Sequence, residues 1–541
     1  MSRLSQRTYW IALGGILALS FFWNLAVAGR GFLPIDQSAI LDGAWRMHLG
    51  QVPFRDFLLT HGLTTMTLQW AAFEIFGVSY DSYLWVGSLQ NLLGTLLILL
   101  VARRLIPDRP GWQLAAGLLT ALWFQAPFGT PWVDESTYLF CMAAMLLLLR
   151  PGAPLLPAGS AREILAGLLI FGGFLSKQNA ATLFLLVAAC IPLARAARAQ
   201  TELLASARIV SGFLLGLLLF LGWLWLAADP YQFYQGIFAY PAGTLLPRLE
   251  RVPWETVTAP IIGKGNSVPR LANFVCLLAA GAWLWQHWQS APTDTTSSDR
   301  FRFLARLSIL LVLFENVFMT VTNNAPENCQ PFSGLLLALL APIAADLLPR
   351  LRPSLSGRTR ILALTPIVLW VAMAARGIKV DWTRRAHDLF AHSSFTGEID
   401  KPGWKALRWP IPYRLNDQAE IRIEDFNALI HDLEALDVNF FVWPDFTILY
   451  PILGKPDPTP LNYFWWGISY PRRYDRTLDE RMLRDLQRHS VRAVVLDRAW
   501  FAMDANPRAL SDFPLVQSWI HTHFEESARH GIFRLLTWNP R

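Results

Sequence analysis

Residues 9–28 read YWIALGGILALSFFWNLAVA, and residues 34–77 read PIDQSAILDGAWRMHLGQVPFRDFLLTHGLTTMTLQWAAFEIFG. The first stretch contains no charge and has the length and apolar character of a helix that crosses a bilayer. The second stretch is more polar and holds three aspartates, and a further apolar run follows at 83–102. This order predicts a membrane protein with a substantial loop between its first two spans.

The composition divides the chain into two parts. Of its 541 residues 53% are apolar and 16% are charged, whereas a soluble domain carries about 25% charge. The charged share is about 12% over residues 1–376 and about 26% over residues 377–541. We therefore expect a polytopic membrane domain at 1–376 and a water-exposed domain at 377–541. The excess positive charge belongs to the membrane part, so no nucleic-acid partner is expected.

Apolar runs predict about eleven membrane-spanning helices, because a span needs about 20 mostly apolar residues and shorter runs suffice where neighbours bury their ends. The runs are 9–28, 83–102, 112–128, 136–149, 164–175, 180–194, 209–228, 271–288, 303–321, 333–348 and 361–375. With the N-terminus inside, arginines concentrate in the inner loops, as the positive-inside rule requires. An odd number of spans then predicts an extracytoplasmic C-terminal domain, which in a bacterial inner membrane faces the periplasm.

The C-terminal part reads as a small α/β domain. Strand-like runs occur at 439–442, 493–496 and 532–536, and helix-like runs occur at 423–436, 478–488 and 514–524. No glycine-rich phosphate loop is present, which argues against nucleotide binding. An aromatic patch, Tyr463, Phe464, Trp465, Trp466 and Tyr470, either stacks on sugar rings or docks the domain on the membrane interface.

The loop at 34–77 resembles the first extracytoplasmic loop of GT-C superfamily glycosyltransferases. The likeness is greatest to the bacterial branch with protein O-mannosyltransferases, the aminoarabinose transferase of lipid A and the RgtA/B/C/D-like enzymes. The elements that carry it are Asp36, Gly50, Pro53, Phe54, Asp56 and the His61-Gly62 turn. Gln37 stands where the family usually has a second acid. The segments WVDESTYLF, with Asp134 and Glu135, and FGGFLSKQNAATLFLL, with Lys177 and Gln178, add to the resemblance.

The resemblance implies a GT-C-like helical fold and an inverting glycosyltransferase. Such an enzyme transfers a hexosyl or pentosyl group from a polyprenyl-phosphate carrier to an extracytoplasmic glycan, lipid or protein. Two alternatives from other classes are a transporter or flippase of polyprenyl lipids or glycolipids, and a non-catalytic membrane scaffold. Acidic residues crowd the outer loops and no internal repeat is visible, which favours the enzyme over the transporter.

Asp36 and Asp56 are the predicted catalytic carboxylates. Asp36 is the expected base that accepts the acceptor proton, because partial burial beside lipid raises a carboxylate pKa toward a useful value. Its structural alternative is the N-cap of the helix that follows. Asp56 either orients the acceptor or the loop through Arg55 and His61, or fixes a turn after Pro53. Asp42 is expected to be solvated or paired with Arg46.

The predicted substrate-binding residues are Asp134, Glu135, Lys177, Gln178, His61 and Arg270. Asp134 and Glu135 either hold an acceptor or a divalent cation, or favour a helix dipole. Lys177 either stabilises the leaving lipid phosphate or extends its charge to the interface, and Arg270 is a further phosphate candidate. His61 alone is also compatible with a structural hydrogen bond. No cofactor is assigned, and a divalent cation is left open.

The predicted topology is tested by a reporter enzyme that is active in one compartment only. Fused after Arg541, a reporter active outside the cytoplasm should give signal, because eleven spans place Arg541 on the outer side. Signal from a cytoplasmic reporter alone would contradict the number of spans.

Overall fold

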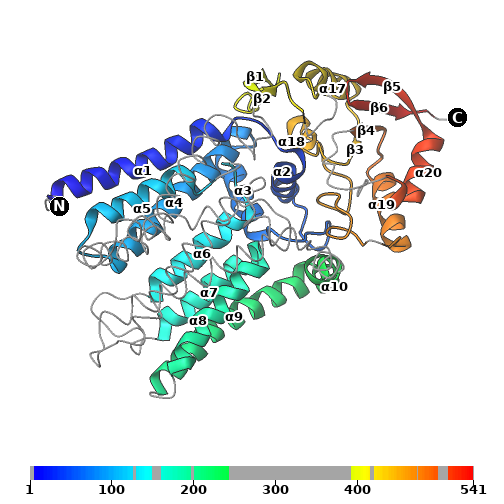
Figure 1. The fold of residues 1–541 in the computed structure, drawn as a ribbon. Helices are drawn as coiled ribbons and strands as arrows, with labels where there is room; N and C mark the ends of the chain where they lie inside the picture. The colour runs from blue at the N-terminus through cyan, green and yellow to red at the C-terminus, as the bar shows by residue number, and fades with distance from the viewer. Residues whose placement is uncertain are drawn as a thin grey trace, which may run out of the picture.

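The computed structural model describes residues 5–125, 129–148, 160–195, 200–242, 392–414, 420–471, 473–497 and 510–539. Helices fill the N-terminal part, and a small sheet with its own helices forms the C-terminal part (Figure 1). The predicted spans at 271–288, 303–321, 333–348 and 361–375, and the domain boundary at 376, lie outside these residues. The number of spans therefore stays a prediction.

All predicted spans within the described residues are helices. They are α1 (Gln6–Ala28), α4 (Tyr80–Leu105), α5 (Pro110–Trp123), α6 (Val133–Leu148), α7 (Ser160–Ser176), α8 (Gln178–Arg195) and α9 (Gln200–Ala227). In this part of the chain, three stretches are long and apolar enough to cross a membrane: Gln6–Ala28, Tyr80–Arg104 and Leu203–Ala227. Phe22 and Trp225 on them are 65% and 80% exposed. Such rings suit contact with lipid.

Helices α7 and α9 pack through glycines. A Cβ atom on Gly167 would lie 2.0 Å from the carbonyl oxygen of Ile209, and one on Gly212 would lie 2.0 Å from that of Ile164. Only glycine permits this approach, and small residues at such contacts are typical of membrane helix pairs. Phe171 and Phe213 then pack edge to face, with ring centroids 5.4 Å apart.

The loop between α1 and α4 folds into two helices, α2 (Pro34–His48) and α3 (Leu63–Phe76). Twelve of the fifteen residues of α2 are buried, and this helix lies between the helical part and the sheet domain (Figure 1). A helix was expected to follow Asp36, but α2 begins before it, at Pro34, whose fixed φ suits a first helical position. α3 was not predicted, because its 14 residues are too few for a span.

The C-terminal sheet has the strand order β3-β4-β6-β5. β3 (Phe440–Trp443) pairs in parallel with β4 (Ala493–Asp497), whereas β6 (Phe533–Trp538) is antiparallel to both β4 and β5 (Phe524–His530). The accompanying helices are α17 (Ile423–Leu436), α18 (Leu449–Leu453), α19 (Arg476–Arg488) and α20 (Pro514–His523), with a 3-10 turn, η3 (Leu510–Asp512), before α20. The predicted α/β character is confirmed.

The sequence pattern did not predict β5 or the hairpin of β1 (Ser394–Glu398) and β2 (Arg408–Ile411). The hairpin joins the end of α1: the Arg408 N–H donates to the Gly29 carbonyl (2.7 Å), and the Gly31 N–H donates to the Arg408 carbonyl (2.9 Å). The segment after α18 joins α2 in the same way. Trp45 Nε1 donates to the Lys455 carbonyl (2.8 Å), and Asn462 Nδ2 donates to the Ala39 carbonyl (2.9 Å).

A buried arginine, Arg46, lies at the centre of this contact. Its side chain is 1% exposed and donates from Nη1 to Asp457 Oδ2 (3.2 Å) and to the Leu461 carbonyl (3.1 Å). Nη2 donates to the Thr459 carbonyl and Nε to Gln51 Oε1 (2.8 Å). The guanidinium also lies over the Phe57 ring, 4.3 Å from its centroid. The hydrogen bonds to Asp457, Thr459 and Leu461 therefore join the first loop to the C-terminal domain, while Gln51 and Phe57 hold the guanidinium from its own loop.

Asp42, one helical turn before Arg46 in α2, is also fully buried, with Oδ2 3.9 Å from Nη1 of Arg46. The prediction that Asp42 pairs with Arg46 is confirmed, and the solvated alternative is wrong. Burial and the negative charge of Asp457 raise the pKa of Asp42 well above its usual range, against the opposing effect of Arg46. Asp42 therefore holds a proton more firmly than a free aspartate does.

Replacing Arg46 tests this contact. Arg46→Met keeps an unbranched apolar stem but leaves Asp457 buried without its cation, which costs about 3 kcal/mol or more. We expect the apparent unfolding temperature, followed by tryptophan fluorescence in detergent, to fall by roughly 5–10 °C.

Arg481→Met is the matched control. Arg481 also joins the two parts, but it is 24% exposed. It pairs with the similarly exposed Asp485 of its own helix (3.7 Å), and across the contact it donates to the carbonyls of Arg55 (3.1 Å) and Asp56 (3.5 Å). Its loss leaves water-accessible carbonyls and should change the unfolding temperature little. Equal effects of the two substitutions would contradict a special role for Arg46.

Candidate functional site

The segment 129–135, which leads into α6, brings together four of the predicted site residues: His61, Asp134, Glu135 and Lys177. Helices α1, α2 and α7 and the first loop all contact it. Asn24 Nδ2 donates to the Gly129 carbonyl (2.7 Å), and Gln37 Nε2 donates to Thr130 Oγ1 (3.0 Å). The His61 ring packs beside Trp132. Ser176 Oγ donates to the Val133 carbonyl (2.9 Å), and Lys177 donates to Asp134. Groups from distant parts of the sequence therefore gather at one place.

Asp134 and Lys177 form an ion pair between Oδ1 and Nζ. Asp134 lies in the first turn of α6 and is 1% exposed, whereas the Lys177 side chain, between α7 and α8, is 14% exposed. Taking two charges out of water is costly unless they neutralise each other. Both predicted roles of Lys177, binding a lipid phosphate and extending its charge to the interface, place an ammonium at the membrane edge. In the structure, the buried carboxylate of Asp134 holds this ammonium in one position.

His61 adjoins this pair but is held by other groups. Its Nδ1 is 2.8 Å from Thr60 Oγ1, which in turn lies 2.7 Å from the hydroxyl of Tyr463 in the C-terminal domain. The ring packs between Trp132 and Tyr463, with centroids 6.3 and 5.9 Å away. Burial, together with the positive charge of Lys177, lowers the pKa of His61 to about 4. At neutral pH His61 is therefore an uncharged hydrogen-bonding group.

The backbone at Gly62 fixes His61 against the helices. Gly62 has φ +87°, a conformation that favours glycine, and its N–H donates to the Ser176 carbonyl (2.8 Å). One helical turn after Gly62, hydroxyl groups form hydrogen bonds with one another: Thr65 Oγ1 lies 2.9 Å from Ser136 Oγ and 2.7 Å from Ser176 Oγ. These bonds satisfy polar groups that would otherwise be buried without partners.

Asp36 is half-buried in the first turn of α2. The N-cap of α2 is Leu33, so the alternative that Asp36 is the N-cap is wrong. Gln37 serves the helix start instead, because its Oε1 accepts from the Leu33 N–H (2.6 Å) while its Nε2 reaches Thr130.

Asp56 lies in a tight turn of the first loop. Its Oδ2 accepts from the Val52 N–H (2.7 Å) and from Arg55 Nη2 (2.8 Å). Burial alone would raise the pKa of Asp56, but these hydrogen bonds and the charge of Arg55 outweigh it, and the pKa is lowered. The hydrogen bonds of Asp56 match the turn-fixing alternative, and none of those described joins it to His61. A catalytic role for Asp56 stays a prediction.

The remaining predicted substrate-binding residues are Glu135, Gln178 and Arg270. Glu135 is 2% exposed in the first turn of α6, next to Asp134. Gln178 is half-buried at the start of α8, directly after Lys177. Arg270 lies outside the described residues. Within the described ranges, no three or more His, Cys, Asp or Glu side chains come together as a metal-binding group, and the cationic Lys177 beside Asp134 disfavours a second cation there.

Thr60, Trp132 and Tyr463 also belong to this site, although they were not among the predicted site residues. Trp132 lies two positions before Asp134, so proximity in sequence could have indicated it. Tyr463 was noticed only within the aromatic patch, and its contact with Thr60 spans 403 positions. Two other members of that patch, Phe464 and Tyr470, are 1% and 3% exposed. Both belong to the core of the C-terminal domain, so docking on the membrane is wrong for these two side chains.

Comparison with known proteins gives a fold but no sequence family. No protein-family model matches the chain, and no curated protein sequence matches it. The structure is similar to that of ArnT, the aminoarabinose transferase of Cupriavidus metallidurans, in its apo state, with a TM-score of 0.56 and 13% identity over 99% of this chain and 100% of ArnT. ArnT bound to undecaprenyl phosphate gives a TM-score of 0.52 at 12% identity, with the same coverage of both chains.

A second similar structure is the Archaeoglobus fulgidus oligosaccharyltransferase in its apo form. The TM-score is 0.51 at 13% identity, over 96% of this chain and 74% of the archaeal protein. At such identities the likeness establishes the fold alone. The chain therefore shares the fold of ArnT and of the archaeal oligosaccharyltransferase, and this is the GT-C-like helical fold that the resemblance of its first loop implied.

Proposed function

We propose that this protein is an integral-membrane glycosyltransferase that transfers a sugar from a polyprenyl-phosphate carrier to an acceptor on the extracytoplasmic face of the inner membrane. The observation that carries the proposal is the buried Asp134–Lys177 pair, which lies beside His61 and Tyr463 where the helices meet the C-terminal domain. A fixed ammonium at such a place suits a lipid phosphate. The fold similarity to ArnT, whose structure has been determined with undecaprenyl phosphate, supports the same reading.

The proposed reaction is a single displacement. The acceptor oxygen or nitrogen forms a bond to the anomeric carbon while the bond from that carbon to the phosphate oxygen breaks, which inverts the configuration. Polyprenyl phosphate leaves with the electron pair, and Lys177 stabilises its negative charge. The acceptor proton passes to the carboxylate of Asp36. His61, being uncharged, contributes hydrogen bonding and position rather than charge. The sugar can be hexosyl or pentosyl, and the acceptor a glycan, lipid or protein.

Purified protein incubated with a labelled polyprenyl-phosphate sugar tests the reaction directly. Transfer to an added acceptor, or slow hydrolysis without one, would support the proposed enzyme. Movement of the labelled lipid across a vesicle membrane without bond cleavage would support the transporter alternative instead. If the labelled lipid is neither cleaved nor moved under conditions where ArnT is active, the result would support the non-catalytic scaffold.

The base is tested by Asp36→Asn. The substitution keeps size and position in the first turn of α2 but removes the proton-accepting carboxylate, so transfer should fall by roughly 10²-fold or more. The unfolding temperature should stay within a few degrees, because Asp36 is not the N-cap. Wild-type turnover in Asp36→Asn would remove this residue from the mechanism and direct attention to Asp56.

The role of Lys177 is tested with three variants. Lys177→Met should lower turnover and weaken binding of polyprenyl phosphate, measured with the product lipid, because it removes the cation that the phosphate contacts. It also leaves Asp134 buried without a partner, which destabilises the protein. Lys177→Met/Asp134→Asn removes both charges and should recover stability without recovering lipid affinity. Lys177→Arg keeps the charge and should restore part of that affinity.

The double variant separates the two readings of Lys177. If this ammonium serves only to neutralise Asp134 and reach the interface, the double variant should bind the lipid as the wild type does. Wild-type affinity in that variant would therefore contradict the phosphate role.

A further inference from the structure

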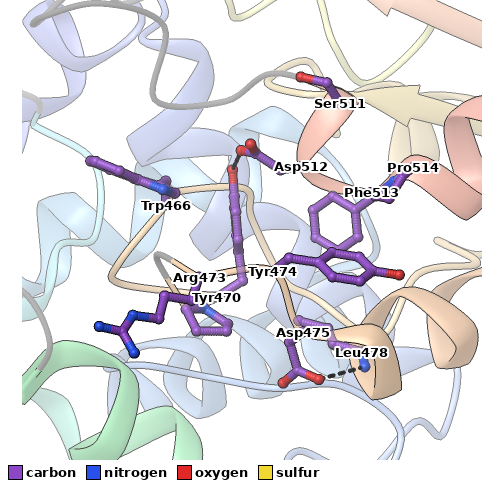
Figure 2. A pocket seen from close by; sticks show the side chains of 11 residues that line it. Trp466, Tyr470, Arg473, Tyr474, Asp475, Leu478, Ser511, Asp512, Phe513 and Pro514 are labelled. Atoms are coloured by element: carbon purple, nitrogen blue, oxygen red, sulfur yellow. Dashed lines mark hydrogen bonds between the residues drawn. The ribbon is translucent and has the colours of Figure 1, made fainter.

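A cavity of about 260 Å³ lies in the C-terminal domain, between the loop before α19 and the segment that joins η3 to α20. Four aromatic residues are among those that line it: Trp466, Tyr470, Tyr474 and Phe513 (Figure 2). Ligand pockets for drug-sized molecules measure roughly 300–1,000 Å³. The cavity is therefore suited to a small unit such as one ring rather than to a lipid chain.

Polar groups are placed at two sides of this cavity. Asp512 Oδ2 accepts a hydrogen bond from the Tyr470 hydroxyl (2.9 Å), while Oδ1 has no hydrogen-bond partner among the described residues. Asp475 Oδ1 accepts from the Thr477 and Leu478 N–H groups (3.0 and 3.2 Å) and so caps α19. Asp475 Oδ2 is likewise without a partner in the described part. Both carboxylates thus have an oxygen that can accept from a ligand.

The aromatic rings and charged groups that line the cavity indicate which class of ligand it can bind. The lining holds two carboxylates, Asp475 and Asp512, and one guanidinium, Arg473, so it disfavours an anion such as a free phosphate. A pyranose ring has apolar C–H faces that pack on aromatic rings and neighbouring hydroxyl groups that donate to carboxylate oxygens. An amino group on the ring would fit the same carboxylates.

The cavity adjoins the candidate site along the chain. Tyr463 bonds Thr60 beside His61, and Trp466 of the cavity follows three residues later. Three residues span at most about 11 Å, so the Cα atoms of Tyr463 and Trp466 lie within that distance. The turn that carries Trp466 is fixed, because the Gly467 N–H donates to the Tyr470 carbonyl (2.7 Å) and Ser469 Oγ accepts from the Trp465 N–H (2.7 Å).

We propose that this cavity binds one pyranose ring of a glycan acceptor and so holds the acceptor next to the transfer site. Its role as an acceptor subsite rests on the proposed function, whereas the binding of a sugar does not. Tyr474 and Trp466 supply stacking faces, and Asp512 accepts from ring hydroxyl groups. A subsite of this kind would select glycan acceptors over simple alcohols.

Titration of the full-length protein in detergent with methyl pyranosides, including a 2-amino sugar, tests the proposal by saturation-transfer NMR. At least one pyranoside should bind saturably to the wild type. Tyr474→Ala and Asp512→Asn should each weaken that binding by tenfold or more, while the unfolding temperature stays near the wild-type value. Lys177→Met/Asp134→Asn, altered only at the transfer site, should bind the sugar normally.

Two outcomes would overturn the subsite: no saturable pyranoside binding to the wild type, or binding that neither Tyr474→Ala nor Asp512→Asn weakens. With a glycan acceptor, the same two variants should raise KM and leave kcat nearly unchanged. Sugar binding that meets these expectations in a protein without transferase activity would instead contradict the proposed function and leave the sugar site standing.

Discussion

The burial of one guanidinium, that of Arg46, determines how the two parts of this protein meet. A charge with 1% exposure is costly unless it is paired and hydrogen-bonded. Arg46 finds acceptors in Asp457, Thr459 and Leu461 of the C-terminal domain and in Gln51 of its own loop. The guanidinium fork needs these groups in one geometry. The first loop and the segment 457–461 are therefore fixed relative to each other.

The candidate site depends on that geometry. The segment held by Arg46 continues to Tyr463, whose hydroxyl is hydrogen-bonded to Thr60, the residue before His61. From the other side, α6 and the end of α7 bring Asp134 and Lys177 together. The C-terminal domain thus contacts α2 and the first loop, and it contributes the Tyr463 side chain to the candidate site. The next residues along the chain line the sugar-sized cavity.

Local patterns in the sequence predicted the elements with strong periodicity, and the rest required long-range contacts. The helix at 423–436 was predicted with the same bounds as α17, because its apolar face repeats every three to four residues. β5, FEESARH, was missed because its side chains are mostly exposed and charged, so it carries no buried pattern. Asp134 and Lys177 were singled out separately, but their pairing joins positions 43 apart and is set by helix packing. Arg46 was expected to pair only within its helix, since nothing in the sequence places Asp457 beside it.

The central claim is that the Lys177 ammonium receives the phosphate of a polyprenyl-phosphate carrier. A density map of the protein prepared with polyprenyl phosphate tests it most directly. We expect phosphate density within hydrogen-bonding distance of Lys177 Nζ, roughly 2.7–3.2 Å, with the lipid tail leaving between the helices. Well-defined phosphate density away from Lys177, with the Asp134–Lys177 pair undisturbed, would contradict it.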